Sequence, residues 1–158
     1  MTHRLSLAAI VTLALAHPAA AQPAAATGVA MPVTTCTAAN AGIESVVPGA
    51  AEQRSVLGSA VTLYHLDRQA AVSVSHTIAV VYDRGVDAGG RACVLVGGPH
   101  DGFFRVDLAN ATETSVDRRG VATVTIGVTH YSPDGKHTPG SIALVIDSRA
   151  PRITARVR

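Results

Sequence analysis

Apolar and polar residues alternate with a period of two along two long segments, and this alternation predicts β-strands that are buried on one face. In Val72–Asp83, one face carries apolar residues, a tyrosine and a histidine, namely Val72, Val74, His76, Ile78, Val80 and Tyr82. In Val121–Tyr131, one face carries Val124, Ile126 and Val128, with Ala122 and His130 in phase. Both segments are rich in β-branched residues, whose stiff side chains suit a pleated sheet better than a helix.

Shorter segments repeat this pattern and predict six further strands: Pro32–Thr37, Ala60–Leu66, Ala92–Val96, Phe103–Leu108, Ser141–Asp147 and Ile153–Val157. Turn-forming residues separate them, and Ser132-Pro133-Asp134-Gly135 predicts a turn directly after Tyr131. Residues 38–59 show no clear period. A short helix around Ala50–Leu57 and an irregular loop are both compatible with that region.

About eight short strands without a long helix predict an all-β fold, an antiparallel β-sandwich of about 7–9 strands. We expect it to occupy residues 31–158 as a single domain. The likeness to an immunoglobulin-like domain is an analogy of architecture, because the chain has no Trp to match the buried Trp of antibody domains. An analogy of this kind carries no function.

The first 21 residues have the layout of a secretory signal peptide. Arg4 precedes an apolar run from Leu5 to Ala16, and small residues at 19–21 suit a signal peptidase. The run is too short to cross about 30 Å of hydrocarbon, which disfavours the alternative of a retained anchor. We predict a signal peptide over 1–21, a flexible Ala-rich leader over 22–30, and a periplasmic or secreted mature protein without a membrane span.

Export changes the interpretation of the two cysteines, Cys36 and Cys93. In an oxidising compartment an even pair usually forms a disulfide, and their separation would suit a bridge between two sheets. Neither has a CxxC partner or an adjacent His or acid, which disfavours a metal site or a nucleophile. A bridge closing a loop of this size would contribute about 4 kcal/mol in the chain-entropy model.

Composition and motifs exclude several classes of function. Aromatic residues make up 3% of the chain, which argues against a nucleic-acid module that stacks bases on aromatic rings. The chain contains no GxSxG, HExxH, P-loop or GxGxxG motif, so no catalytic constellation stands out. We therefore expect a protein that is not an enzyme and binds no nucleic acid.

Three histidines lie in phase with apolar residues of predicted strands: His65, His76 and His130. Histidines that point inward from neighbouring strands can converge on Zn²⁺ or Cu²⁺, which favour imidazole nitrogen. No pair has a tight spacing such as HxH or HxxxH. Structural roles are therefore the alternative, with His76 as a hydrogen-bonded core residue and the other two at solvated strand ends.

Positive charge is concentrated at the C-terminal end of the chain. Residues 22–117 hold five basic and nine acidic residues, whereas residues 118–158 hold seven basic and two acidic residues. In the last strand, Arg152, Arg156 and Arg158 share one face. Such a face can attract an acidic partner, although a charged edge strand can also serve to resist aggregation.

Together these features favour an exported, non-enzymatic β-sandwich that acts by surface binding, as a periplasmic accessory factor or as a secreted surface-structure or adhesion subunit. Its expected partner is another envelope or surface protein or an acidic polysaccharide. No cofactor is expected under this hypothesis. The alternative hypothesis is a periplasmic protein that binds Zn or Cu through His65, His76 and His130.

Overall fold

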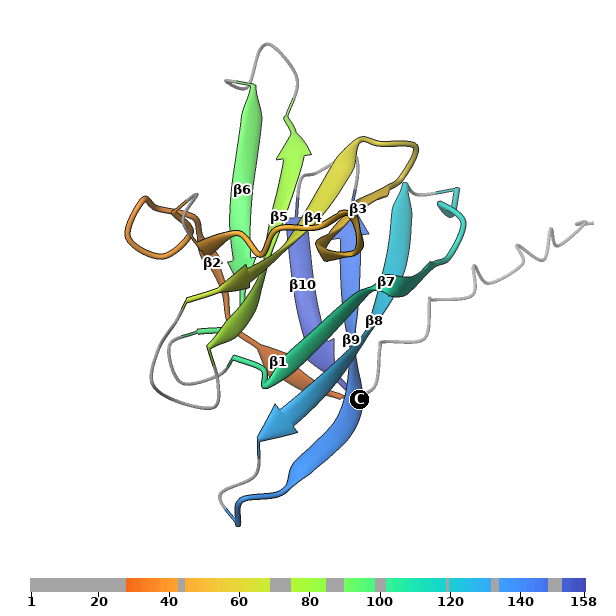
Figure 1. The fold of residues 1–158 in the computed structure, drawn as a ribbon. Helices are drawn as coiled ribbons and strands as arrows, with labels where there is room; N and C mark the ends of the chain where they lie inside the picture. The colour runs from red at the N-terminus through yellow and green to blue at the C-terminus, as the bar shows by residue number, and fades with distance from the viewer. Residues whose placement is uncertain are drawn as a thin grey trace, which may run out of the picture.

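The structure, a computed structural model, describes residues 28–42, 45–68, 75–84, 90–98, 102–118, 120–131, 134–147 and 152–158. In these residues ten strands form two antiparallel sheets of five strands each, which pack against each other (Figure 1). The predicted all-β sandwich is therefore confirmed. The predicted signal peptide and residues 22–27 of the predicted leader lie outside the described residues.

Each sheet has a simple strand order. Sheet A has the order β1-β10-β9-β8-β7, with strands β1 (Val29–Met31), β10 (Arg152–Val157), β9 (His137–Asp147), β8 (Val121–Tyr131) and β7 (Arg105–Glu113). Sheet B has the order β2-β6-β5-β4-β3, with strands β2 (Val33–Thr35), β6 (Arg91–Val96), β5 (His76–Asp83), β4 (Val61–Asp67) and β3 (Gln53–Val56). A short 3-10 helix, η2 (Ala50–Glu52), leads directly into β3.

The apolar side chains of the alternating pattern fill the space between the sheets. The inward face of each sheet carries fully inaccessible apolar side chains, among them Leu63, Ile78, Val80, Val124, Ile126, Ile142 and Leu144. Burying each such side chain stabilises the fold by roughly 1.5–3 kcal/mol relative to leaving it in water. Because the period of a strand is two, the alternate positions of the same strands must face outward.

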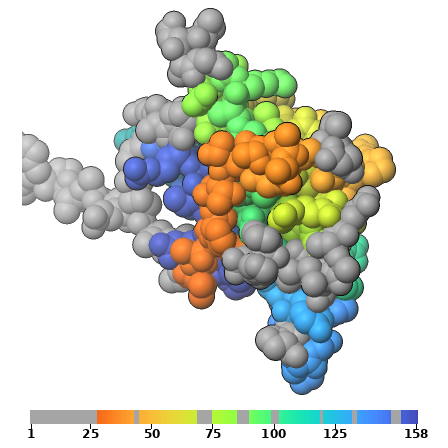
Figure 2. Space-filling view, turned by 90° about the vertical axis from the view of Figure 1, so that its left-hand side faces the viewer, coloured from red at the N-terminus to blue at the C-terminus, as the bar shows by residue number. Residues whose placement is uncertain are grey.

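One N-terminal segment belongs to both sheets. β1 pairs with β10 in sheet A, and after Pro32 the chain continues as β2, which pairs with β6 in sheet B. The carbonyl of Pro32 accepts a hydrogen bond from the amide of Gly97 (3.1 Å). Figure 2 shows this segment in orange, between the blue strand of sheet A and the green strands of sheet B. The crossover closes one side of the sandwich.

Side chains close the opposite side, where β3 and β7 are the edge strands. The guanidinium group of Arg54 donates to the carbonyls of Ala109 (3.1 Å) and Ala111 (3.2 Å). These carbonyls lie where the register between β7 and β8 shifts, so a bulge in β7 presents them to the other sheet. The carboxylate of Glu113 accepts from the amide of Leu57 at 3.0 and 3.1 Å.

The structure differs from the sequence-based expectation at two short strands, which raise the strand number to ten. Val29 and Ala30, assigned to the flexible leader, belong to β1. Gln53–Val56, for which a helix or a loop was expected, is β3, and only Ala50–Glu52 is helical. Both are edge strands of three or four residues, too short to show an alternation. The first residues of the predicted strand Val72–Asp83 lie outside the described residues.

The disulfide between Cys36 and Cys93 is present, with a Cα–Cα distance of 5.3 Å. We expected this bridge to join the two sheets, and that prediction is wrong. Cys36 follows β2 and lies opposite Cys93 of the neighbouring strand β6, so the bridge links two strands of sheet B. Both cysteines face outward and pack against a small apolar cluster of Leu66, Ala79 and Leu95.

Candidate functional site

His65 and His76 lie side by side on the inward face of sheet B. His76 begins β5 and is paired with Asp67 of β4, which makes His65 its diagonal neighbour on the same face. Gln53 is paired with Tyr64, and the same register brings Glu52, at the end of η2, next to His65. Three segments of sheet B thus bring a carboxylate and two imidazoles together.

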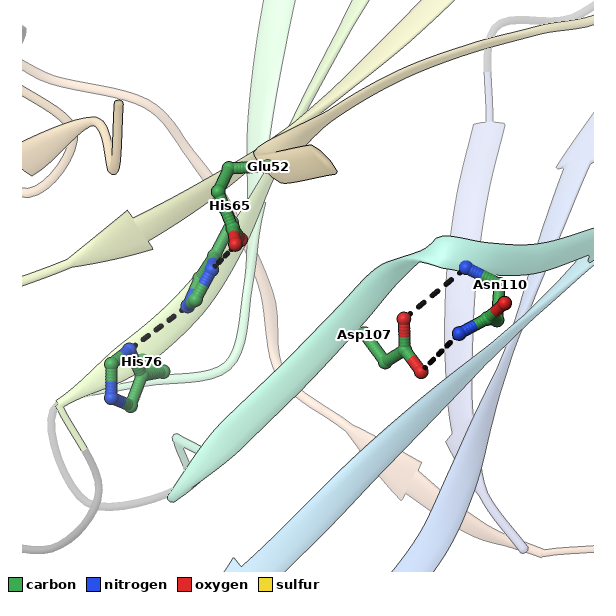
Figure 3. A network of polar contacts seen from close by, with 5 residues as sticks. All are labelled: Glu52, His65, His76, Asp107 and Asn110. Atoms are coloured by element: carbon green, nitrogen blue, oxygen red, sulfur yellow. Dashed lines mark hydrogen bonds and ion pairs between the residues drawn. The ribbon is translucent and has the colours of Figure 1, made fainter. Parts of the chain in front are cut away.

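These three side chains form a continuous chain of hydrogen bonds (Figure 3). Oε2 of Glu52 lies 2.5 Å from Nδ1 of His65, and Nε2 of His65 lies 2.9 Å from Nδ1 of His76. An ionised carboxylate only accepts, so Nδ1 of His65 donates to Glu52. With His65 neutral, its Nε2 then accepts from Nδ1–H of His76. Figure 3 shows the other ring nitrogen of His76 pointing away from His65.

Burial affects the charge of the side chains in this hydrogen-bonded series. His65 is 6% exposed, and it and Thr77 are the buried polar or charged residues of the described core, whereas His76 is half-buried. Burial lowers the pKa of His76, and repulsion from a proton on His65 acts in the same direction, while Asp67 and Glu52 act in the opposite direction. The His76 ring is therefore neutral at neutral pH, with a lone pair on one nitrogen.

His130 lies elsewhere in the space between the sheets. Its ring meets Phe103 edge-on, with centroids 5.6 Å apart, and a Cβ on Gly140 would lie 3.1 Å from it. Gly140 thus leaves the room that this ring occupies, and burial lowers the pKa of His130. Among the described residues, no group of three or more His, Cys, Asp or Glu side chains is arranged to hold a metal. The structure brings together two of the three predicted histidines.

The burial of two of the three histidines also differs from the predicted structural roles. We expected His76 in the core and His65 at a solvated strand end, but His65 is the more buried of the two. The reason is that Glu52 and η2 pack beside His65, whereas His76 stands at the start of β5.

The three C-terminal arginines lie on the outward side of sheet A. Ala155 of β10 is buried, while Arg152 and Arg158 are exposed and Arg156 is half-buried, with its guanidinium donating to the carbonyl of Gly28 (3.0 Å). The edge-strand explanation of their charge does not hold for the second half of this strand, which includes Arg156. β10 lies between β1 and β9, so its backbone is paired on both sides over Ala155–Val157.

A hollow lies on the outward face of sheet A, lined in part by Arg105, Asp107, Gly127, Thr129 and Pro139. Arg105, Thr129 and Pro139 form one cross-strand row, and Asp107 and Gly127 lie in the next row. The missing side chain at Gly127 makes the hollow. The carboxylate of Asp107 accepts from the side chain (2.8 Å) and the backbone amide (3.2 Å) of Asn110, and these bonds lower its pKa (Figure 3).

Exposed aromatic rings cluster beside this hollow. Phe104 and Tyr131 are each 40% exposed, and the ring of His137 lies 3.7 Å from that of Phe104 and 6.0 Å from that of Tyr131, measured between centroids. Tyr131 and His137 are paired at the end of the β8–β9 hairpin, which projects beyond the rest of the sandwich in Figure 1. On the outward face, the row of Tyr131 and His137 is the next after the row of Thr129 and Pro139, which lines the hollow.

The sequence does not point to Glu52, Arg105 or the aromatic cluster. Glu52 lies in the region without a period, and its partner is 13 residues away across a strand pairing that a single sequence does not reveal. Phe104, Tyr131 and His137 come from three strands or their ends. The sequence carries one signal for these residues. The alternation of Val121–Tyr131 places Tyr131 on the face opposite the apolar one, and therefore outward.

Comparisons with known proteins supply no further guide. No family model matches the chain, and neither a curated protein nor a solved structure matches it. In the described part of the chain, no helix is long and apolar enough to span a membrane.

Proposed function

We propose that this chain is an exported, disulfide-bonded β-sandwich without catalytic activity, and that it binds an acidic polysaccharide through the outward face of sheet A. The predicted signal peptide and the disulfide support export, since structural disulfides persist in oxidising compartments. The observation that carries the proposal is that four arginines lie on one outward face, which extends from β7 to β10. Arg105 joins Arg152, Arg156 and Arg158 there.

Charge on this face favours an anionic ligand. The outward positions of its strands hold four arginines, and Asp107 and Asp147 are the acidic residues there. The Asp107 carboxylate accepts from Asn110, and Asp147 lies opposite Arg152 in the register of β9 and β10. A guanidinium group binds a carboxylate through two parallel hydrogen bonds, which makes arginine well suited to the uronate groups of an acidic sugar chain.

The rest of the face suits a sugar better than a protein. Thr123, Thr125 and Thr129 offer hydroxyls that both donate and accept hydrogen bonds. Phe104 and Tyr131 present flat, partly apolar rings at one end of the face, against which the apolar side of a sugar ring can stack. A protein interface needs an apolar centre surrounded by polar residues. Here the aromatic rings lie at the end of the face, and in the middle the threonine hydroxyls lie beside Ala143, which is buried, and Val145, which is half-buried.

The test is binding of the mature chain to polygalacturonate, measured calorimetrically at several salt concentrations, with neutral dextran and poly-glutamate as comparison ligands. We expect binding to polygalacturonate that weakens with salt, little binding to dextran, and recovery of the polymer at its original chain length. The double variant Arg105→Ser/Arg158→Ser should weaken binding by about tenfold or more, because each charge-assisted contact contributes about 1.5 kcal/mol or more.

The matched control is Arg84→Ser/Arg91→Ser, which removes the same charge from exposed positions at the end of the β5–β6 pair in sheet B. This control should bind almost as the wild type does. An equal loss in both double variants would show a non-specific charge effect and would overturn the proposal. Tighter binding to poly-glutamate than to polygalacturonate would overturn it in favour of a protein partner, and shortening of the polymer would overturn the absence of catalysis.

A further inference from the structure

We infer that His65 and His76 form a two-nitrogen binding site for Cu²⁺ at the end of the inward face of sheet B, with Glu52 as the residue that positions His65. This site is separate from the outward face of sheet A and does not depend on the function proposed for that face. It narrows the metal hypothesis to two histidines, because His130 packs against Phe103 instead.

The spacing of the two nitrogens fits adjacent ligands of one metal ion. Nε2 of His65 and Nδ1 of His76 are 2.9 Å apart. Two nitrogens at about 2.0 Å from a metal are about 2.8 Å apart at neighbouring corners of a square and about 3.3 Å apart at the corners of a tetrahedron. The observed distance, which is that of the hydrogen bond between the rings, is short enough for both nitrogens to reach one ion. Cu²⁺ binds imidazole nitrogen more strongly than Zn²⁺ does in the general order of affinities of divalent metals.

Glu52 supplies the outer support that histidine ligands usually have. A ligating histidine commonly donates its second ring N–H to a carboxylate, which fixes the tautomer and the direction of the ligating nitrogen. Oε2 of Glu52 accepts from Nδ1 of His65 in this way, leaving Nε2 as the ligating atom. The support is itself held in place, since η2 and β3 attach Glu52 to the sheet on which His65 lies.

Access and proton balance both permit metal binding. His76 is half-buried, so the pair can be reached from solvent, and Asp67, its direct cross-strand neighbour, adds an acidic residue beside the site. On binding, the Nδ1–H···Nε2 bond between the two rings breaks and two metal–nitrogen bonds form. The proton moves from Nδ1 to Nε2 of His76, so the ring stays neutral, and water completes the coordination.

The experiment uses the mature protein after treatment with a chelator, titrated with Cu²⁺ alone and followed by thermal unfolding and electron paramagnetic resonance. We expect one Cu²⁺ per chain, a higher melting temperature, and a resonance spectrum with splitting from two nitrogens. A metal that binds only the folded state must stabilise it. Zn²⁺ should give a smaller shift at the same concentration.

The variants separate this site from other histidines. His65 is buried and its replacement endangers the fold, so His76→Gln is the variant that should abolish the shift and the nitrogen splitting. Glu52→Gln should weaken Cu²⁺ binding by about 10–100-fold and keep the two-nitrogen spectrum. His137→Gln, which changes an exposed histidine on sheet A, should leave both unchanged. Absence of binding, or equal binding by the wild type and His76→Gln, would overturn the inference.

Discussion

The outward faces of the two sheets are built in opposite ways. The outward face of sheet B carries a buried apolar cluster, and the segment that follows β2 lies over it, held by the disulfide and by contacts of Ala41 and Val46. An isolated bridge between Val46 and Leu66 fastens the same segment to β4. The outward face of sheet A has no such cover in the described residues, and it presents arginine and threonine side chains to water.

This difference separates a face that contributes to stability from the face to which we assign the proposed binding. Apolar residues at outward positions need a covering segment, because each exposed apolar side chain forgoes the free energy of burial. Hydroxyl and guanidinium groups need none, since water satisfies their hydrogen bonds. The covered face therefore contributes to folding, and the uncovered face leaves its polar groups accessible to the ligand that we propose.

The largest expected effect comes from removing the tether of the covered face. Replacing both cysteines, Cys36→Ser/Cys93→Ser, should reduce the free energy of unfolding by about 4 kcal/mol, because the bridge closes a loop with a sequence separation of 57 residues. Urea unfolding of the oxidised wild type and the double variant measures this difference. A loss below about 1 kcal/mol would show that the covering segment stays folded by packing alone.

A pair of truncations tests the comparison of the two faces directly. Leu95→Ala, in the covered cluster of sheet B, should reduce the free energy of unfolding by about 2–4 kcal/mol, through lost burial and the cavity that remains. Thr125→Ala, at an outward position of sheet A, should cost at most about 1 kcal/mol. Similar losses from both would contradict the division of the faces, as measured by urea unfolding under one set of conditions.

Between the two outward faces, the inward histidines should make stability depend on pH. The pKa values of His76 and His130 are lowered by burial, and in the unfolded chain both rings titrate near 6.5. As the pH falls below 6.5, the unfolded state takes up protons first and the free energy of unfolding decreases until the pH reaches the folded pKa values. Above 6.5 the full contribution is present.

Urea unfolding at pH 7.5 and pH 5 measures this dependence. His130→Gln should make the difference between the two pH values smaller than in the wild type, because one of the titrating rings is gone. The matched control is His137→Gln, which changes an exposed histidine. We expect this variant to show the same difference in the free energy of unfolding between the two pH values as the wild type. A wild-type stability that stays constant, or rises, between pH 7.5 and pH 5 would contradict the expected direction.

The smallest effect on stability is expected where the effect on binding is largest. Arg105→Ser/Arg158→Ser should change the free energy of unfolding by less than about 0.5 kcal/mol, because substitutions of solvated side chains outside a packed network rarely do more. The measurement is urea unfolding of the same preparations used for polygalacturonate binding. A larger loss would mean that these arginines stabilise sheet A, and reduced binding could then be a consequence of a damaged fold.

Much of the architecture can be predicted from the sequence because it follows from alternation. The strand Val121–Tyr131 is found with the predicted bounds, and its apolar positions face the core. The disulfide is also predicted, from cysteine number and an exported context. The position of this disulfide within sheet B cannot be predicted, because the pairing of β2 with β6 joins segments some 60 residues apart.

The candidate sites are harder to predict because their residues meet through strand register. His65 and His76 are recognised as inward-facing, but only the pairing of Asp67 with His76 makes them diagonal neighbours. The acidic partner of His65 comes from a turn of helix whose pattern is too short to identify. On sheet A, the row that joins Arg105 to Thr129 and Pro139 crosses three strands, and no spacing along the chain encodes it.

The crossover at Pro32 has a mechanical consequence. β1 and β2 are parts of one ribbon, but only the β2 end is anchored covalently, at Cys36. We expect the three-residue β1 to open more often than β2, which would expose the backbone groups of Ala155–Val157 to a strand from a second molecule. Amide hydrogen exchange should accordingly be faster along β1 than along β2, and reduction of the disulfide should bring the two rates together.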